Sequence, residues 1–187
     1  MAVQKWERLS QETVARTRIF DLTLQMMRNP RNGVVRDINL LETRDWVNVV
    51  AVTTGHELVL VEQYRHGIDD VTLEIPGGIV DPGEDPRDTA VRELREETGY
   101  EGTHVTSLGA VQPNPAILGN LCHTYLVEEC RSAHDLELDV GEDIEVQTMP
   151  VGEIPGAIAS GRIRHALVVC GIWWLATRRP DLLPGLG

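Results

Sequence analysis

The segment from Gly78 to Tyr100, GIVDPGEDPRDTAVRELREETGY, constrains the fold of this chain most, because it combines a turn, a helix and many carboxylates in 23 residues. Asp85 is a favourable N-cap, and Pro86 follows at the first helical position, where its missing N–H costs nothing. Gly99 supplies the stop, since a residue without a β-carbon tolerates the left-handed conformation that often follows a helix. The segment therefore predicts a helix between Asp85 and Gly99.

The two faces of this predicted helix differ in character. Ala90, Val91 and Leu94 recur at helical spacing, and we expect them to form a buried stripe. The opposite face is charged, and its three glutamates stand at i, i+3 and i+4, so that their carboxylates share one side. The charged residues are Arg92, Glu93, Arg95, Glu96 and Glu97.

The cluster of three glutamates, whose like charges repel one another, has two interpretations. Like charges at i,i+4 cost about 0.2–0.5 kcal/mol per pair, and Arg92 to Glu96 is the one clear i,i+4 pair of opposite charge. The first interpretation is a solvated acidic helix face. The second is a site for a hard divalent cation, which binds several carboxylate oxygens and takes waters and substrate phosphates as its other ligands.

The whole segment resembles the signature of the Nudix hydrolases. That signature is a glycine, five residues, Glu, seven residues, Arg-Glu, an aliphatic residue, any residue, Glu-Glu, any residue, Gly and a bulky apolar residue. An aromatic residue at the last position is the single departure. The matching positions are Gly78, Glu84, Arg92, Glu93, Leu94, Glu96, Glu97, Gly99 and Tyr100.

The resemblance implies roles for individual residues. It implies that Glu93, Glu96 and Glu97 bind Mg²⁺, or Mn²⁺ as a substitute, and that the backbone carbonyl of Gly77 is a further ligand. It also implies that Glu84 and Arg92 hold the catalytic carboxylates in place. Such a site fits metal-assisted attack of water on a diphosphate, because cations neutralise phosphate oxygens and lower the pKa of a bound water.

Composition limits the functions that this chain can have. The formal net charge of −12 argues against a protein whose affinity for a phosphate backbone rests on basic patches, so we expect no long nucleic acid as a partner. Cys122, Cys130 and Cys170 lack metal-ligand spacing and are typical of reduced thiols. The first residues do not resemble a secretory signal, and the longest apolar run, 166–176, is too short to cross a bilayer. We therefore expect a cytoplasmic protein that does not enter membranes.

Hydrophobic periodicity predicts an N-terminal β-hairpin in residues 1–45 and a catalytic domain in residues 46–187. The hairpin has strands at 13–28 and 34–42 around the turn 29–33. Strands interrupted by the box helix and followed by helices on two sides indicate an α/β fold, an α/β/α sandwich with a mixed sheet. The further strands are expected at 46–53, 57–64, 71–75, 104–111, 121–127 and 144–149, and the later helices at 152–160 and 164–177.

The chain as a whole resembles the ADP-ribose pyrophosphatase branch of the family. In that branch an N-terminal ribbon helps to build a homodimer, so the resemblance implies a homodimer here. An arginine in the segment that corresponds to VEQYR grips the diphosphate there, which makes Arg65 a candidate for bidentate phosphate binding; the alternative is an ordinary surface arginine. Glu74, in LEIPGG, is a weaker candidate that faces the same opening.

Two loops extend this comparison. Pro115 lies 16 residues after Gly99, where ADP-ribose-type enzymes have a proline, and this favours nucleoside diphosphate sugars. The run Ala-Ile-Leu-Gly that follows departs from the glycine- and serine-rich run of some of these enzymes, so the sugar preference stays open. The acidic loop 139–145, DVGEDIE, either serves solubility or carries the general base that the family often places there. Glu142 is the best positional match, with Asp143 and Glu145 in reserve.

These observations predict a Mg²⁺-dependent hydrolase that cleaves ADP-ribose or a related nucleoside diphosphate sugar into a nucleoside monophosphate and a sugar phosphate. The base in this reaction is Glu142 or a box glutamate such as Glu96. Other nucleotides remain as alternative substrates, namely a dinucleotide coenzyme, a nucleoside triphosphate or a capped RNA. A nucleotide-sensing module without catalysis is the alternative outside enzymes, although all box carboxylates are present.

Overall fold

The computed structural model describes residues 2–138 and 140–183. The chain divides into two compact units, each of which is described here by itself. The first unit contains the residues up to Arg44 together with Gln112–Leu121. The second contains Asp45–Val111 and the chain from Cys122 onward. We call it the catalytic unit because it includes the whole box segment, from which the sequence predicts catalysis.

The first unit is built on a three-stranded antiparallel sheet, where the sequence predicted a two-stranded hairpin. The predicted strand 13–28 divides because Thr17 stabilises a turn: its Oγ1 accepts hydrogen bonds from the N–H groups of Ile19 and Phe20 at 3.3 and 3.0 Å. Threonine hydroxyls commonly form such local turns. The strands, in spatial order, are β1 (Glu7–Arg16), β2 (Asp21–Arg28) and β3 (Val35–Glu42).

The loop that carries Pro115 belongs to this first unit. Leu41 N–H donates to the carbonyl of Ile117 at 2.8 Å, and the Asn120 side chain donates to the carbonyl of Arg44 at 3.0 Å. Residues 112–121 thus leave the catalytic unit between two of its strands and bond to the end of β3.

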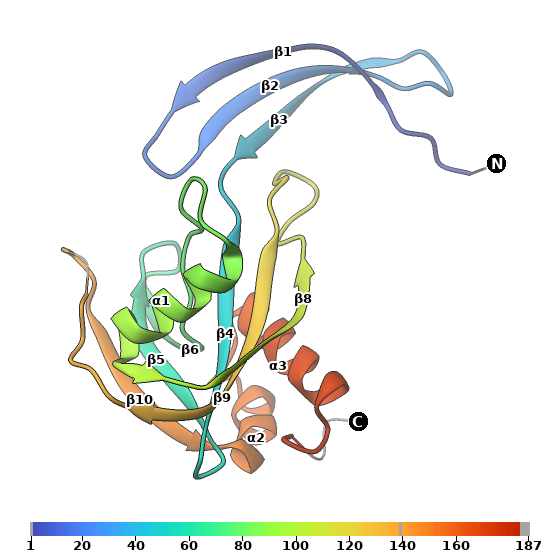
Figure 1. The fold of residues 1–187 in the computed structure, drawn as a ribbon. Helices are drawn as coiled ribbons and strands as arrows, with labels where there is room; N and C mark the ends of the chain where they lie inside the picture. Colours follow the sequence, from blue (N-terminus) through green and yellow to red (C-terminus); the bar gives the residue numbers. More distant parts are fainter. Residues whose placement is uncertain (1, 139, 184–187) are drawn as a thin grey trace. The chain divides into compact units, whose positions relative to one another are not determined.

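The second unit is built on a seven-stranded mixed sheet (Figure 1). The strands follow the order β10-β5-β4-β9-β7, while β6 pairs with β5 and β8 with β9. The β4–β9 pair is parallel and the other pairs are antiparallel. Their bounds are β4 Trp46–Thr53, β5 Glu57–Arg65, β6 Asp70–Glu74, β7 Tyr100–Glu101, β8 His104–Val111, β9 Cys122–Ser132 and β10 Ile144–Pro150.

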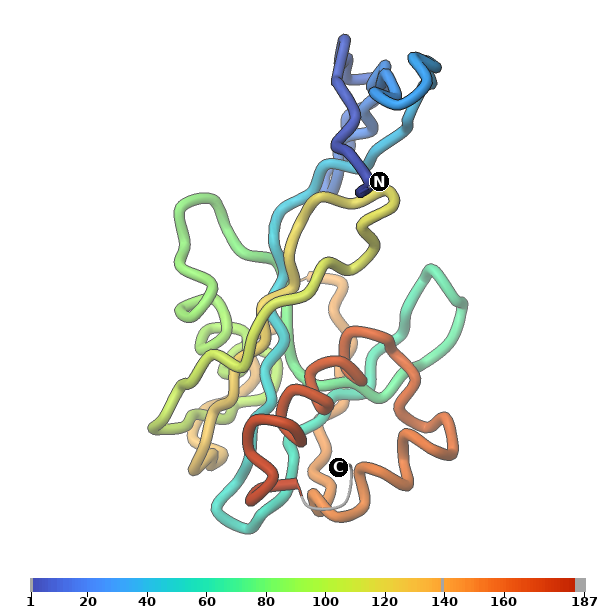
Figure 2. The backbone as a smooth tube through the Cα atoms, turned by 90° about the vertical axis from the view of Figure 1, so that its right-hand side faces the viewer, coloured from blue at the N-terminus to red at the C-terminus, as the bar shows by residue number. Residues whose placement is uncertain are grey.

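Helices cover both faces of this sheet. The box helix α1 (Pro86–Thr98) packs on one face, and a short 3₁₀ turn, η1 (Val151–Glu153), leads into α2 (Ile154–Ala159) and α3 (Ala166–Arg178) on the other. Figure 2 shows α1 in green and α3 in red on different sides of the cyan strand β4. This arrangement confirms the predicted α/β/α sandwich. None of the helices in the described parts of the chain is both long and apolar enough to span a membrane.

Strand alternation divides the core of the second unit into two layers. Burial of each large aliphatic side chain contributes about 1.5–3 kcal/mol, and both layers are rich in valine and leucine. One predicted member of the α1 stripe is absent from its layer: Val91 is 44 % exposed, because it lies at the edge of the buried arc. The α1 layer includes Val47, Val49, Ala51, Ala90 and Leu94, and the α3 layer includes Val50, Leu60, Leu126, Ile172 and Leu175.

Candidate active site

The box begins where residues 76–78 run alongside β4. Val49 N–H donates to the carbonyl of Pro76 at 2.8 Å, and Val47 N–H donates to the carbonyl of Gly78 at 2.9 Å. Gly77, between them, instead donates its N–H to Oε2 of Glu97 at 3.0 Å. The N–H of Gly77 therefore points to a carboxylate of α1, and the resemblance implies that its carbonyl is a metal ligand.

Gly78 leaves room for a carboxylate that lies directly against it. A β-carbon at this position would stand 2.2 Å from Oε1 of Glu93, which is far inside van der Waals contact. The first glycine of the box thus lets the α1 carboxylates approach the chain that enters the box.

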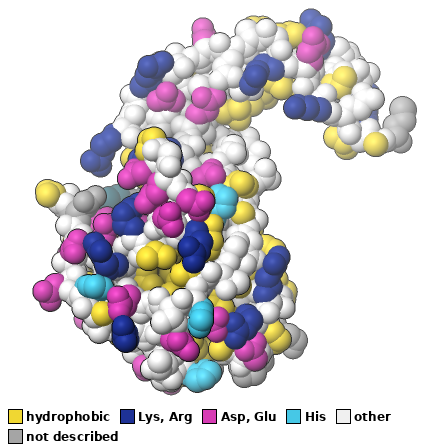
Figure 3. Space-filling view, in the orientation of Figure 1, with side chains coloured by type: hydrophobic (Ala, Val, Ile, Leu, Met, Phe, Trp, Pro, Cys, Tyr) yellow, Lys and Arg dark blue, Asp and Glu magenta, His cyan; other side chains and the backbone are white. Residues whose placement is uncertain are grey.

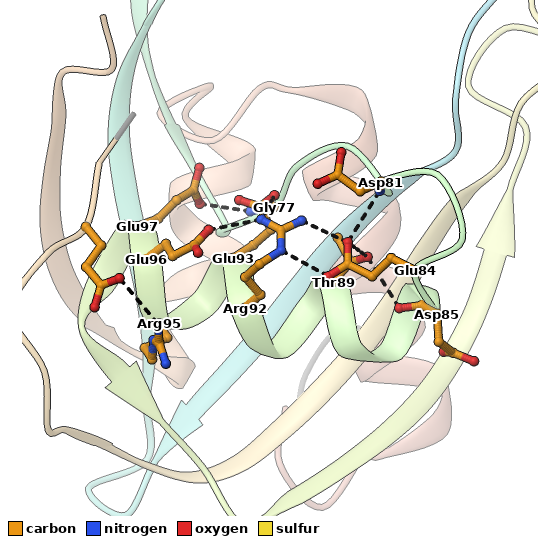
Figure 4. A network of polar contacts seen from close by, with 11 residues as sticks. Gly77, Asp81, Glu84, Asp85, Thr89, Arg92, Glu93, Arg95, Glu96 and Glu97 are labelled. Atoms are coloured by element: carbon orange, nitrogen blue, oxygen red, sulfur yellow. Dashed lines mark hydrogen bonds and ion pairs between the residues drawn. The ribbon is translucent and has the colours of Figure 1, made fainter. Parts of the chain in front are cut away.

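Arg92 lies at the centre of the site and contacts three carboxylates (Figure 4). Its Nε and Nη2 donate to the two oxygens of Glu84, each at 3.0 Å, which is the bidentate geometry of a strong ion pair. Its Nη1 donates to Glu93 Oε1 and to Glu96 Oε2, each at 2.9 Å. Arg92 therefore links the loop that precedes α1 to two glutamates on the helix.

Glu84 is held in its ionised form by this network. Hydrogen bonds from Arg92, and then from Thr89 Oγ1 at 2.7 Å, lower the pKa of Glu84 to about 2. The sequence prediction did not include Thr89, which is fully buried one helical turn before Glu93. Its i, i+4 spacing from Glu93 was the signal that would have placed it on the carboxylate face.

Glu93 and Glu97 have the opposite environment. Glu97 is 5 % exposed and the Glu93 side chain 14 % exposed, and burial raises the pKa of Glu93 to about 7 and that of Glu97 to about 8. The Arg92 charge lowers the pKa of Glu93 without cancelling the effect of burial. Repulsion between neighbouring carboxylates contributes in the same direction as burial. A buried carboxylate, Glu97, and a largely buried one, Glu93, therefore share this helix with too little positive charge around them to hold their pKa values in the usual carboxyl range.

The donor set fits a hard divalent cation. Within residues 2–138 and 140–183, no three His, Cys, Asp or Glu side chains converge into a ready metal-binding group, and Arg92 contacts two of the three box glutamates instead. The oxygens of Glu93, Glu96 and Glu97 are nevertheless the ligand type that such cations prefer, and a bound cation would supply the missing positive charge. Figure 3 shows acidic side chains gathered with basic ones on the face of the catalytic unit that α1 covers.

Arg65 and Glu74 form a second ion pair on β5 and β6. Arg65 Nε donates to Glu74 Oε1 at 2.8 Å and Nη2 to Oε2 at 2.7 Å, and Thr72 Oγ1 also donates to Glu74. Glu74 is 2 % exposed; burial alone would raise its pKa, but the hydrogen bonds from Arg65 and Thr72 outweigh burial and lower it. The pKa of Arg65 is raised, first by Glu74 and in part by the charge of Glu97. Arg65 is therefore oriented by Glu74 within electrostatic range of the box.

The three candidate bases, Glu142, Asp143 and Glu145, differ in their positions in the structure. Glu142 is exposed, and its charge is one of the smaller contributions that raise the pKa of Glu93 and Glu97. Glu145 pairs in register with Glu62 on β5, whereas the next residue, Val146, packs into the α1 layer. Because side chains alternate along a strand, Glu145 points to the face away from α1.

Asp143 and Pro115 are the remaining predicted residues. Asp143 is exposed beside Glu142. Pro115 belongs to the first unit, so the geometry of the catalytic unit alone does not include it.

The chain is similar to known proteins over most of its length. The chain matches the NUDIX domain family over residues 42–169. It is 30 % identical over 173 residues to an ADP-ribose pyrophosphatase of Bacillus subtilis, covering 89 % of this chain and 93 % of that protein. It is 29 % identical over 172 residues to a methanol dehydrogenase activator of Bacillus methanolicus, covering 91 % and 90 %.

Similarity to solved structures extends over almost the whole chain. The crystal structure of an ADP compounds hydrolase superimposes with a TM-score of 0.87 and covers 97 % of both chains at 24 % sequence identity, which supports the fold. The family match spans β4 to the start of α3 and contains the complete box. Enzymes of this family generally use divalent metal ions. The chain therefore belongs to the Nudix hydrolase family and is an enzyme of that family.

Proposed function

We propose that this enzyme hydrolyses the diphosphate bond of ADP-ribose or of a related nucleoside diphosphate sugar, giving a nucleoside monophosphate and a sugar phosphate. The observation that carries the proposal is the pair of carboxylates Glu97, which is buried, and Glu93, which is largely buried, together with the Arg65–Glu74 ion pair, whose arginine lies within range of the Glu97 charge. A cation held by these carboxylates and the guanidinium of Arg65, which Glu74 orients, could each bind phosphate oxygens, and this suits a substrate with two phosphates. The similarity to the Bacillus subtilis ADP-ribose pyrophosphatase supports the choice of substrate.

Glu93, Glu96, Glu97 and the carbonyl of Gly77 would hold Mg²⁺, with Mn²⁺ as the substitute to test. When bound, this cation would neutralise phosphate oxygens and make a nearby water more acidic. Arg92 contacts Glu93 and Glu96 directly. Glu84, in the loop before α1, holds the guanidinium of Arg92 in place.

Arg65 is proposed to bind the diphosphate. Glu74 accepts hydrogen bonds from Nε and Nη2 of Arg65, and arginine has five N–H donors, so that donors remain for phosphate oxygens. The Arg65 side chain is 43 % exposed, which makes it accessible to a ligand, whereas buried Glu74 serves to orient it. Pro115 is proposed to contribute to substrate selection from its own loop.

Glu142 is proposed as the general base. The water oxygen forms a bond to one phosphorus, the bridging P–O bond breaks, and the departing phosphate keeps the electron pair of that bond. The proton of the water passes to the Glu142 carboxylate, which is exposed and lies within electrostatic range of Glu93 and Glu97. Glu96 is the candidate within the box.

A panel of nucleotide substrates in Mg²⁺ tests the proposed function. ADP-ribose has no terminal phosphate for an added phosphatase to remove, whereas its two cleavage products are monoesters from which the phosphatase releases inorganic phosphate. We expect phosphate release with ADP-ribose and related nucleoside diphosphate sugars in Mg²⁺. When EDTA removes the metal we expect no AMP, which is then measured directly because EDTA can also inhibit the added phosphatase. Absence of release from every sugar in the panel, with a folded protein, would contradict the proposal.

The panel also includes the other nucleotide classes. The similarity to the methanol dehydrogenase activator, whose name does not refer to ADP-ribose, is the observation that favours a wider test. Dinucleotide coenzymes, nucleoside triphosphates and capped RNA are therefore compared with ADP-ribose. The net charge of −12 disfavours long RNA.

A further inference from the structure

The chain that leaves β9 stays bonded to the last turn of α1. We call residues 133–137 the anchor segment. The N–H groups of Ala133 and His134 both donate to the carbonyl of Gly99, at 2.9 and 3.0 Å, and the N–H of Glu137 donates to the carbonyl of Glu96 at 2.9 Å. The anchor segment is therefore held to the helix that carries the box glutamates.

These bonds satisfy backbone groups that the helix itself leaves unpaired. The last four carbonyls of a helix have no partner within it. The carbonyl of Arg95 is satisfied by Gly99 N–H at 2.8 Å, and that of Glu96 by the anchor segment. The Arg95–Glu137 ion pair at 3.3 Å is exposed, and such pairs contribute little. The backbone bonds thus account for most of the attachment.

Gly99 permits the close approach of the anchor segment. A β-carbon there would stand 2.3 Å from the carbonyl oxygen of His134, and the φ angle of +71° is also one that glycine favours. The last glycine of the box therefore has a second role beyond ending the helix: it leaves room for the anchor segment.

The chain that continues from the anchor segment carries Glu142 and then enters β10 at Ile144, where β10 pairs with β5. Glu142 is thus connected on one side to α1 through Glu137 and on the other side to the sheet.

From these contacts we infer that the anchor segment is a positioning element for catalysis, which fixes the start of the Glu142 loop against the helix that bears the metal-binding carboxylates. This inference rests on the proposed role of Glu142. It assigns Glu137 a function through its backbone N–H rather than through its carboxylate.

Glu137→Pro tests the inference, because proline has no N–H to donate to Glu96. The matched control is Glu137→Ala, which removes the side-chain ion pair and keeps the N–H. We expect Glu137→Pro to lower kcat by about 10- to 100-fold, the scale of a slightly misplaced catalytic group. KM, the Mg²⁺ concentration for half-maximal rate and the unfolding temperature should stay near wild type, and Glu137→Ala should resemble wild type in all of them.

If Glu137→Pro does not fold, Ala133→Pro removes one of the two bonds to Gly99, with Ala133→Ser as its control. Hydrogen exchange measures the anchor segment without substrate: the amides of residues 133 and 134 should exchange faster in Glu137→Pro than in Glu137→Ala. Unchanged exchange, or a wild-type kcat in the folded proline variants, would overturn the inference.

Combination with Glu142→Gln separates this inference from the proposed function. If the anchor segment acts through Glu142, Glu137→Pro should cause no further loss of kcat in the Glu142→Gln background. A full additional loss there overturns the positioning role, even though the chain remains a hydrolase. If the wild-type chain hydrolyses no substrate in the panel, the proposed function is contradicted instead. The hydrogen-exchange measurement then still decides whether the backbone bonds hold the anchor segment to α1.

Discussion

Glu84 and Glu93 both bind the guanidinium of Arg92, yet their pKa values move in opposite directions. Glu84 receives two hydrogen bonds from Arg92 and one from Thr89, and its pKa falls to about 2. Burial dominates at Glu93 and raises its pKa to about 7. The ionised form of Glu84 is thus already satisfied by the protein, whereas that of Glu93 needs a further cation.

Glu142→Gln tests the assignment of the general base. We expect kcat to fall by about two to four orders of magnitude, the usual scale for lost acid–base help, with little change in Mg²⁺ affinity. Glu145→Gln is the matched control, because Glu145 pairs with Glu62 and points away from the α1 face of the sheet. We expect Glu145→Gln to have a much weaker effect.

Rates and Mg²⁺ titrations of both variants decide between the candidates. A fully active Glu142→Gln enzyme would move the base to Asp143 or to a glutamate of the box. A Glu142→Gln variant that loses its response to Mg²⁺ would identify Glu142 as a ligand of the cation.

Among the elements of the fold, α1 was predictable because its signals are local. Asp85 accepts a hydrogen bond from Arg87 N–H as an N-cap should, and Gly99 adopts the left-handed conformation that ends the helix. By contrast, all ten residues of β1 are exposed. Its sequence therefore has no need to alternate apolar and polar residues, and that alternation is the signal by which a strand is predicted. The anchor segment was missed because its bonds to α1 use backbone groups, which leave no signature in side chains.

The raised pKa values on α1 predict how the stability of the metal-free protein depends on pH. A carboxyl whose folded pKa lies above its unfolded value binds its proton more tightly in the folded state, so stability falls as pH rises between the two values. For Glu93 and Glu97 this window extends from about 4.5 to about 8. We expect the free energy of unfolding in EDTA to decrease across it.

Urea unfolding at several pH values in EDTA measures this effect. Glu97→Gln should flatten the decrease and be more stable than wild type at pH 8, because glutamine carries no charge to bury. Glu84 acts in a separate window, since its lowered pKa makes stability fall only as pH drops from about 4.5 toward about 2. Stability in EDTA that stays constant or rises from pH 5 to 8 would disprove the assigned environment of the pair.

For the whole molecule, the first unit predicts self-association. Its three-stranded sheet exposes large apolar side chains, and no helix lies within the described part of this unit to cover them. We expect a homodimer in which a second copy of the chain covers this surface. The exposed residues include Leu9, Val14, Ile19, Met26 and Val35.

Light scattering of the purified chain at micromolar concentration checks the oligomeric state. Met26→Lys, which places a charge on the exposed surface of β2, should shift a dimer toward the monomer. A wild-type chain that is monomeric, folded and active at these concentrations would refute the expected dimer.

Across the whole chain, the sequence was enough to identify the box and the residues that flank it. It was not enough to show which of these residues contact one another. The fixed spacing of Glu93, Glu96 and Glu97 on a helix was sufficient to put them on one face. The bidentate contact of Arg65 with Glu74 depends on the pairing of β5 with β6, and spacing along the chain does not reveal that register. The assignment of Pro115 to the first unit likewise depends on backbone bonds between distant segments.

We propose that the carboxylates of Glu93, Glu96 and Glu97 on α1 support metal-dependent cleavage of a nucleoside diphosphate sugar. The most direct measurement is the rate of AMP release from ADP-ribose by wild type and Glu97→Gln, each with Mg²⁺ and with EDTA. We predict release by wild type only in Mg²⁺, and loss of most of that rate in a folded Glu97→Gln variant, because the helix loses a carboxylate and keeps its apolar stripe. Equal rates for wild type in Mg²⁺ and EDTA, or a wild-type rate for Glu97→Gln in Mg²⁺, would contradict the claim.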